Sequence, residues 1–175
     1  MITFKEFLLE AHSFGCIMGT LSESVNQYID SIQTKIDSSI LYTGEDDEYI
    51  KGGLQKHFRH VTIFYGLTEK HFNQPLNDEL SSLINSNKNF EVTIRGVDYF
   101  DLADYTVVFL KVYSPELRGL HDKIVEFVPE YKSNFPDYTP HVAVAWIEPG
   151  KRIDFDSNET FTEKFKEIHI YSPSD

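Results

Sequence analysis

The chain has 175 residues, 41% hydrophobic and 14% aromatic, which predicts one globular unit with a substantial core. No apolar run approaches the roughly 18 residues of a membrane-spanning helix, so no membrane partner is expected. The formal net charge of −12 has the wrong sign for a protein that grips long duplex nucleic acid through its phosphates. Any anionic ligand is therefore expected to be small or to meet a local basic patch.

The amino-terminal segment, residues 1–14, predicts a short amphipathic helix, because apolar side chains recur at helical spacing at Phe4, Phe7, Leu8 and Ala11. Acidic residues lie within this segment and no small-residue cleavage pattern follows, so it is not typical of a secretory signal. The lone Cys16 can form no internal disulfide and has no metal-ligand companion. We expect a reducing compartment, the cytoplasm.

Hydrophobic periodicity predicts strands and helices along the rest of the chain. Strands are expected at residues 16–21, 59–65, 90–97, 105–113, 138–147 and 165–171. Helices are expected at residues 23–36 after an N-cap at Ser22, at 68–84 after Gly66 breaks the preceding strand, and at 115–128 from Pro115. Residues 42–53 are predicted to form a loop, and residues 97–104 a hairpin-like connection.

This order divides into two comparable halves, and no Pro-, Ser- or Gly-rich linker separates them. We therefore predict a single bilobal domain over residues 1–175. The expected fold is α+β, two-lobed and pseudo-symmetric, with antiparallel or mixed sheets lining a central cleft and helices outside. A cleft between two lobes is a natural place for a site.

Two strand-like runs begin with similar residues: RHVTIFYGL at 59–67 and YTPHVAVAWI at 138–147. Side chains alternate along a strand, so His60, Thr62 and Phe64 are expected on one face. His141, Ala143 and Ala145 are expected on the corresponding face of the second run. Val61, Ile63, Val142, Val144 and Trp146 then form the core side.

Two histidines that meet across a cleft can act as a general acid and a general base, because imidazole titrates near neutral pH. One accepts a proton from an attacking hydroxyl or water, and the other donates a proton to the leaving oxygen. Phosphodiester cleavage is the reaction that this pairing suits. The Thr62 hydroxyl could hold a non-bridging phosphate oxygen.

Other interpretations of the histidines remain open. Each could cap its strand and bind a loop carbonyl. A zinc site would need a third ligand such as Asp137, although no His-x-x-x-His spacing is present. The remaining histidines show no repeated context and are expected at the surface or partly buried: His12, His57, His71, His121 and His169.

Further substrate contacts are predicted around the motifs. Tyr138 and Phe64 could reach the cleft and stack on a base. Lys51, Lys56 and Arg59 precede the first motif and are candidate phosphate contacts. Gly52-Gly53 lacks the continuation of a P-loop, and the chain has no G-x-S-x-G nucleophile motif. No cofactor is expected.

The two histidine motifs resemble those of the 2H phosphoesterase superfamily, and the predicted element order is similar to its RNA 2',3'-cyclic phosphodiesterase (ligase-like) branch over residues 16–171. YTG…GGL followed by RHVTIFYGL is similar to a phage branch that includes the anti-CBASS nucleases, which destroy cyclic di- and trinucleotide signals. The opening MITFKEFLLEA resembles amino termini of T4-like phage proteins.

The resemblance implies a metal-independent hydrolase with His60 and His141 as acid and base and Thr62 on the phosphate. It implies a phage counter-defence nuclease that cleaves cyclic oligonucleotides in the host cytoplasm. The alternatives are a 2',3'-cyclic phosphodiesterase acting on RNA ends and a non-catalytic sponge that binds cyclic nucleotides.

One position departs from the family pattern, because Ala143 stands where the family has Thr or Ser. The lost hydroxyl would cost about 1 to 3 kcal/mol of transition-state stabilisation. Thr139 could supply a replacement hydroxyl.

Overall fold

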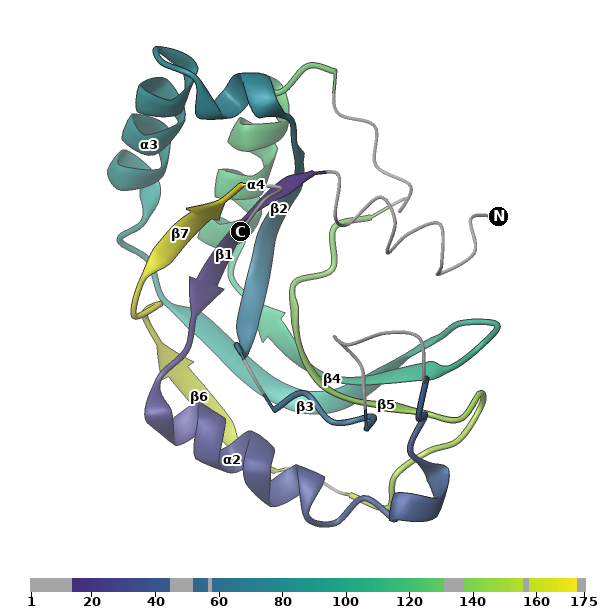
Figure 1. Ribbon diagram of the computed structural model, residues 1–175. Helices are drawn as coiled ribbons and strands as arrows, with labels where there is room; N and C mark the ends of the chain where they lie inside the picture. The colour runs from purple at the N-terminus through teal and green to yellow at the C-terminus, as the bar shows by residue number, and fades with distance from the viewer. Residues whose placement is uncertain (1–13, 45–51, 57, 131–136, 156–157, 173–175) are drawn as a thin grey trace.

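The computed structural model describes residues 14–44, 52–56, 58–130, 137–155 and 158–172. It confirms the α+β class, and all strand pairs are antiparallel (Figure 1). The strands are β1 (Gly15–Thr20), β2 (His60–Leu67), β3 (Val92–Asp101), β4 (Thr106–Tyr113), β5 (His141–Ile147), β6 (Thr160–Glu163) and β7 (Ile168–Tyr171). The helices are α2 (Glu23–Gln33), α3 (Leu76–Asn87) and α4 (Pro115–Phe127), with short 3₁₀ turns η1 (Ser38–Ile40) and η2 (Glu69–Phe72).

The strands form two sheets, with orders β2-β1-β7 and β5-β4-β3-β6. Both strands that begin with a motif histidine, β2 and β5, are therefore edge strands, and they contact each other. Figure 1 shows α2 beside the four-stranded sheet and α3 and α4 beside the three-stranded sheet. Helix α2 contacts β5, and α4 contacts β2. Helices α2 and α4 thus each pack on the motif strand of the opposite half of the chain.

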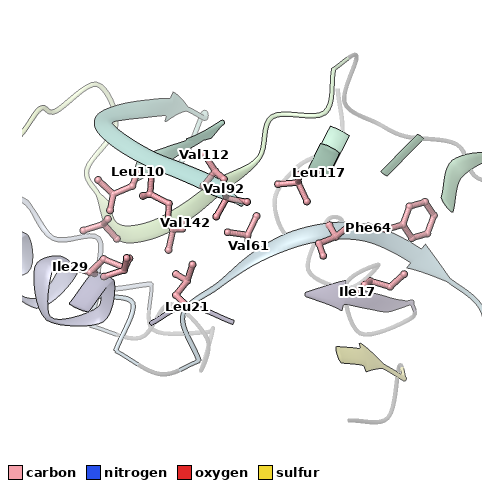
Figure 2. Packing of buried hydrophobic residues seen from close by; sticks show 14 of the residues in the cluster. Ile17, Leu21, Ile29, Val61, Phe64, Val92, Leu110, Val112, Leu117 and Val142 are labelled. Carbon is pink, nitrogen blue, oxygen red and sulfur yellow. The ribbon is translucent and has the colours of Figure 1, made fainter. Parts of the chain in front are cut away.

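One core cluster draws side chains from both sheets and from all three helices (Figure 2). Val61 and Val142, which directly follow the two histidines, are both fully buried in it. Burial of a valine stabilises the fold by roughly 1.5 to 3 kcal/mol. Because successive side chains on a strand point to opposite faces, burial of these valines turns His60 and His141 away from the core.

The predicted helix at 23–36 begins as expected, with the Ser22 hydroxyl accepting a hydrogen bond from the Val25 amide, but it ends at Gln33. The predicted helix at 68–84 is wrong as a single helix. It is divided into η2 and α3, because Pro75 at the start of α3 lacks an amide proton. Thr68 does cap η2. The prediction that Gly66 ends a strand is also wrong, since β2 continues to Leu67 with Gly66 at φ 128°.

The predicted connection at 97–104 is mostly strand, because β3 extends to Asp101. Strand β6 was not predicted, and only its pairing with β3 defines it. The predicted amino-terminal helix, Lys51, and His12 and His57 lie outside the described residues. Within the described part of the chain, no helix is both long and apolar enough to span a bilayer.

Candidate active site

His60 and His141 occupy equivalent positions at the first residues of β2 and β5. The Nδ1 of His60 lies 2.7 Å from the Phe58 carbonyl oxygen, and the Nδ1 of His141 lies 2.8 Å from the Thr139 carbonyl oxygen. A carbonyl oxygen only accepts, so each Nδ1 carries the proton. The predicted hydrogen bond to a loop carbonyl is therefore present at both residues, and it leaves both Nε2 atoms for proton transfer.

Burial lowers the pKa of both imidazoles. For His60 the hydrogen bond to Phe58 opposes this shift, and the charge of His141 lowers the pKa of His60 further. The hydrogen bond to Thr139 opposes the shift of His141. The structure therefore brings the two predicted histidines within electrostatic reach of each other. Both are mainly neutral at neutral pH, because their pKa values lie below the ordinary value of about 6.5.

A β-bulge follows each histidine at the same distance. In the first half Met18 pairs with Thr62 and Ile17 with Phe64, so Ile63 is the extra residue. In the second half Phe109 pairs with Ala143 and Val108 with Ala145, so Val144 is the extra residue. A bulge inserts one residue and reverses the alternation beyond it.

These bulges correct three predictions. Phe64 was expected to face the substrate, but the reversal turns it into the core, where it is 1% exposed. Ala145 was expected on the face of His141 and Ala143, but it is buried in the same core. Trp146 was expected there with Val142, but it packs instead in a second cluster with Tyr105 and Val107.

Side chains from α2, from α4 and from the segment before β5 donate to the carbonyl groups at both bulges. In β2 the Ile63 carbonyl accepts from His121 Nδ1 at 2.7 Å, and the Thr62 carbonyl accepts from the Tyr138 hydroxyl at 2.9 Å. In β5 the Val144 carbonyl accepts from Gln33 Nε2 at 2.8 Å. Since β2 is an edge strand, the bonds from His121 and Tyr138 satisfy carbonyls that no further strand pairs. The Val144 carbonyl also accepts from the Gln55 amide at 3.0 Å. Helices α2 and α4 thereby fix the histidine strands.

Tyr138 is a positioning residue in this arrangement. Its ring stacks on His121 with centroids 3.9 Å apart and planes at 2°, and Arg118 donates a hydrogen bond to its carbonyl at 2.9 Å. Burial raises the pKa of Tyr138, so its hydroxyl remains a donor to Thr62. The predicted contact of Tyr138 with a base stays a prediction.

Thr62 and Ala143 are both partly exposed at equivalent strand positions. Around the second position the wall is aromatic: Phe100 and Phe109 stack at 4.1 Å, and His141 packs edge-on against both. Ala143 packs against the same cluster as Phe100. The site thus carries a hydroxyl on one side and an apolar wall on the other.

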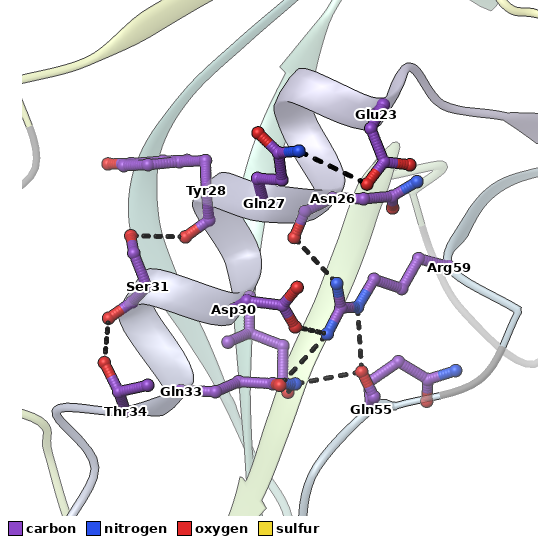
Figure 3. A network of polar contacts seen from close by, with 11 residues as sticks. Glu23, Asn26, Gln27, Tyr28, Asp30, Ser31, Gln33, Thr34, Gln55 and Arg59 are labelled. Carbon is purple, nitrogen blue, oxygen red and sulfur yellow. Dashed lines mark hydrogen bonds and ion pairs between the residues drawn. The ribbon is translucent and has the colours of Figure 1, made fainter.

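Arg59 was predicted to contact phosphate, but its guanidinium is held within the fold (Figure 3). It donates to the Gln55 and Asn26 carbonyls at 2.9 and 2.7 Å and to Asp30 and Gln33 at 2.6 and 3.0 Å. Its side chain is 8% exposed. Because these acceptors occupy the guanidinium, the prediction of a phosphate contact for Arg59 is wrong.

Two other predicted contacts lie at the surface. Lys56 is exposed in the segment before β2, and Thr139 is exposed just before β5. Thr139 contributes its carbonyl to His141, and a role for its hydroxyl stays a prediction. Asp137, the proposed third zinc ligand, is exposed. Among the residues that the structure describes, no group of three or more His, Cys, Asp or Glu side chains could hold a metal ion.

Sequence reasoning missed several side chains beside the histidines. Phe58 is 46% exposed, adopts a positive φ of 48° and places its ring 5.2 Å from that of His60. Its position two residues before His60 was an available signal. The contacts of Phe100, Phe109 and His121 depend on strand register and helix packing, for which the sequence offered no signal.

Comparison with solved structures identifies several similar folds. E. coli LigT complexed with 3'-AMP matches with a TM-score of 0.60 and 13% identity, covering 91% of this chain and 87% of that chain. The MHV ns2 PDE domain matches with a TM-score of 0.58 and 18% identity, covering 91% and 98%. TT0787 of Thermus thermophilus matches with a TM-score of 0.56 and 18% identity, covering 90% and 84%. At these identities the likeness concerns the fold.

A search of the curated proteins found no match to the sequence. The model of the 2'-5' RNA ligase superfamily matches residues 22–161, which include both histidine strands and the helices that hold them. The 2H phosphoesterase assignment made from the two histidine motifs is confirmed, and the chain belongs to the 2'-5' RNA ligase superfamily.

Proposed function

We propose that the protein is a metal-independent phosphodiesterase in which His60 and His141 exchange protons with the substrate. The observation that carries this proposal is the matched tautomer of the two imidazoles, each held through Nδ1 with Nε2 left for chemistry. One histidine must be neutral and accept a proton, while the other must be protonated and donate one.

On a 3',5' linkage the neutral imidazole removes the proton of the ribose 2'-hydroxyl. The O2' atom attacks phosphorus, the bond from phosphorus to O5' breaks, and the second imidazole protonates O5'. The products are a 2',3'-cyclic phosphate end and a free 5'-hydroxyl. Thr62 donates a hydrogen bond to a non-bridging oxygen as charge develops.

The proposed substrates are cyclic oligonucleotide signals, cleaved in the cytoplasm of a phage-infected host. The net charge of −12 favours a small ligand over long RNA, since phosphate-dominated binding needs an extended basic surface. The resemblance of YTG…GGL and RHVTIFYGL to the anti-CBASS branch supports the counter-defence role.

A second candidate is the opening of 2',3'-cyclic phosphates at RNA ends. The structural similarity to E. coli LigT complexed with 3'-AMP favours it, because 3'-AMP is a nucleotide with a terminal phosphate. Here water would replace the 2'-hydroxyl as the nucleophile.

Incubation of the protein in EDTA with cyclic di- and trinucleotides and with an RNA that ends in a 2',3'-cyclic phosphate separates these activities by chromatography. Turnover of the cyclic oligonucleotides supports the first candidate, and turnover of the RNA end alone supports the second. Intact ligand that co-elutes stoichiometrically with the protein would contradict catalysis and identify a sponge.

The pH dependence of kcat/KM is expected to be bell-shaped, with its maximum below a pH of about 6.5. Burial lowers the pKa of both histidines, so the form with one proton shared between them is most populated on the acidic side. As pH rises through the higher pKa, the proton donor is lost and kcat/KM falls. A maximum above a pH of about 8 would contradict this account.

Ala143→Thr is expected to raise kcat about tenfold, because the added hydroxyl can bind a phosphate oxygen opposite Thr62. Ala143→Val is the matched control, since valine has the shape of threonine without the hydroxyl. Steady-state kinetics on the same substrate distinguish the variants. If the threonine and valine variants have the same kcat, the missing hydroxyl does not limit the rate.

A further inference from the structure

A row of residues crosses the four-stranded sheet from His141. Strand register pairs His141 with Lys111, Lys111 with Arg95 and Arg95 with Thr160, one residue on each of β5, β4, β3 and β6. Directly paired residues on antiparallel strands point to the same face. Arg95 therefore shares the face of His141, about 10 Å away across two strand spacings.

A pocket of about 370 Å³ lies along this row. Its lining includes Arg95, Lys111, Tyr113, Asn158 and Thr160. The β3 bulge lies at Gly96, which has φ 71°, and a Cβ atom there would lie 3.4 Å from Cε of Lys111. That distance is an ordinary van der Waals contact, so the positive φ is what favours glycine at this position.

The pocket has two cations and an aromatic ring. The Arg95 guanidinium lies 4.9 Å from the centre of the Tyr113 ring and makes no ion pair within the described residues. Lys111 Nζ lies 3.5 Å from Asp98 Oδ2, and Glu159 also lines the pocket. Arg95 is therefore the cation best placed to bind an anion. A guanidinium stacked on a ring can still donate hydrogen bonds from the N–H groups that lie in its own plane.

We propose that the Arg95 pocket binds a phosphate of the substrate adjacent to the one held at His60 and His141. This inference rests on the proposed function and defines its substrate class: the enzyme acts on oligonucleotides with at least two phosphates. Arg95 and Lys111 contact the second phosphate, and Tyr113, which is 43% exposed, offers a face to a base. Arg95 adds a cationic hydrogen-bond donor on the face of His141, in a chain whose formal net charge is −12.

The test compares a substrate with one phosphate, a nucleoside 2',3'-cyclic monophosphate, with a dinucleotide that carries the same cyclic end and an internal phosphate. For the wild type, kcat/KM for the dinucleotide exceeds that for the mononucleotide. Arg95→Gln is expected to reduce this ratio about tenfold, the loss typical of a charge-assisted hydrogen bond. Lys111→Met is expected to reduce it in the same direction. Lys88→Ala is the control, because Lys88 is exposed at the end of α3.

An Arg95→Gln ratio equal to that of the wild type would overturn the proposal. If the wild type opens the cyclic end of neither substrate, the second candidate activity fails, and the pocket is tested by equilibrium binding. The dinucleotide is then expected to bind Arg95→Gln about tenfold more weakly than wild type. Equal binding by the two proteins would overturn the pocket independently of catalysis.

Discussion

His60→Ala and His141→Ala are each expected to lower kcat by about 10²- to 10⁴-fold. Each substitution removes one member of an acid and base pair whose Nδ1 atoms are held by the Phe58 and Thr139 carbonyls. Because both imidazoles act in one step, the double variant is expected to lose much less than the product of the single losses. Single-turnover rates at saturating enzyme measure the chemical step directly.

The control is Lys88→Ala, because Lys88 is exposed at the end of α3. It is expected to retain the wild-type rate. A wild-type rate in either His60→Ala or His141→Ala would contradict the assignment of that residue to proton transfer.

Arg59→Met is expected to lower the free energy of unfolding by about 2 to 4 kcal/mol, because it removes several charge-assisted hydrogen bonds that the nearly buried guanidinium donates. Its guanidinium joins the segment before β2 to α2 through Gln55, Asn26 and Gln33. The same α2 residue, Gln33, donates to the β5 bulge at Val144. Urea denaturation followed by circular dichroism measures the change.

Asp30→Asn is the matched control for the ion-pair part of this network. The Arg59 guanidinium lowers the pKa of Asp30, but Asp30 is 63% exposed, so solvent screens the pair and its loss should cost less than about 1 kcal/mol. A stable Arg59→Met protein with an increased KM would contradict the structural role and restore the predicted phosphate contact.

Much of the fold could be predicted because local patterns agree with it. Ser22 caps α2, Pro115 starts α4, and Val61 and Val142 are buried as the alternation indicates. The pairing of His60 with His141 followed from two similar motifs at the heads of strands. These signals depend on residues that are close together along the chain, so they can be recognised in a single sequence.

The bulges at Ile63 and Val144 could not be predicted, because a bulge is defined by its partner strand. Because the bulge at Ile63 was not predicted, the burial of Phe64 was not predicted either. Arg59 was misassigned for a related reason, because its acceptors on α2 are distant in sequence. From the sequence alone, a cation beside a motif could contact either a ligand or the rest of the fold. Strand β6 depends on pairing with β3 in the same way.

The central claim is that one histidine donates a proton to the leaving oxygen and the other accepts one from the nucleophile. The most direct test is the cleavage rate of an RNA dinucleotide in which sulfur replaces the bridging O5', because a thiolate leaves without needing a proton. The variant that lacks the acid is expected to regain most of its activity on this substrate, and the variant that lacks the base is expected to regain little. Rescue of both His60→Ala and His141→Ala, or of neither, would contradict a division of labour between them.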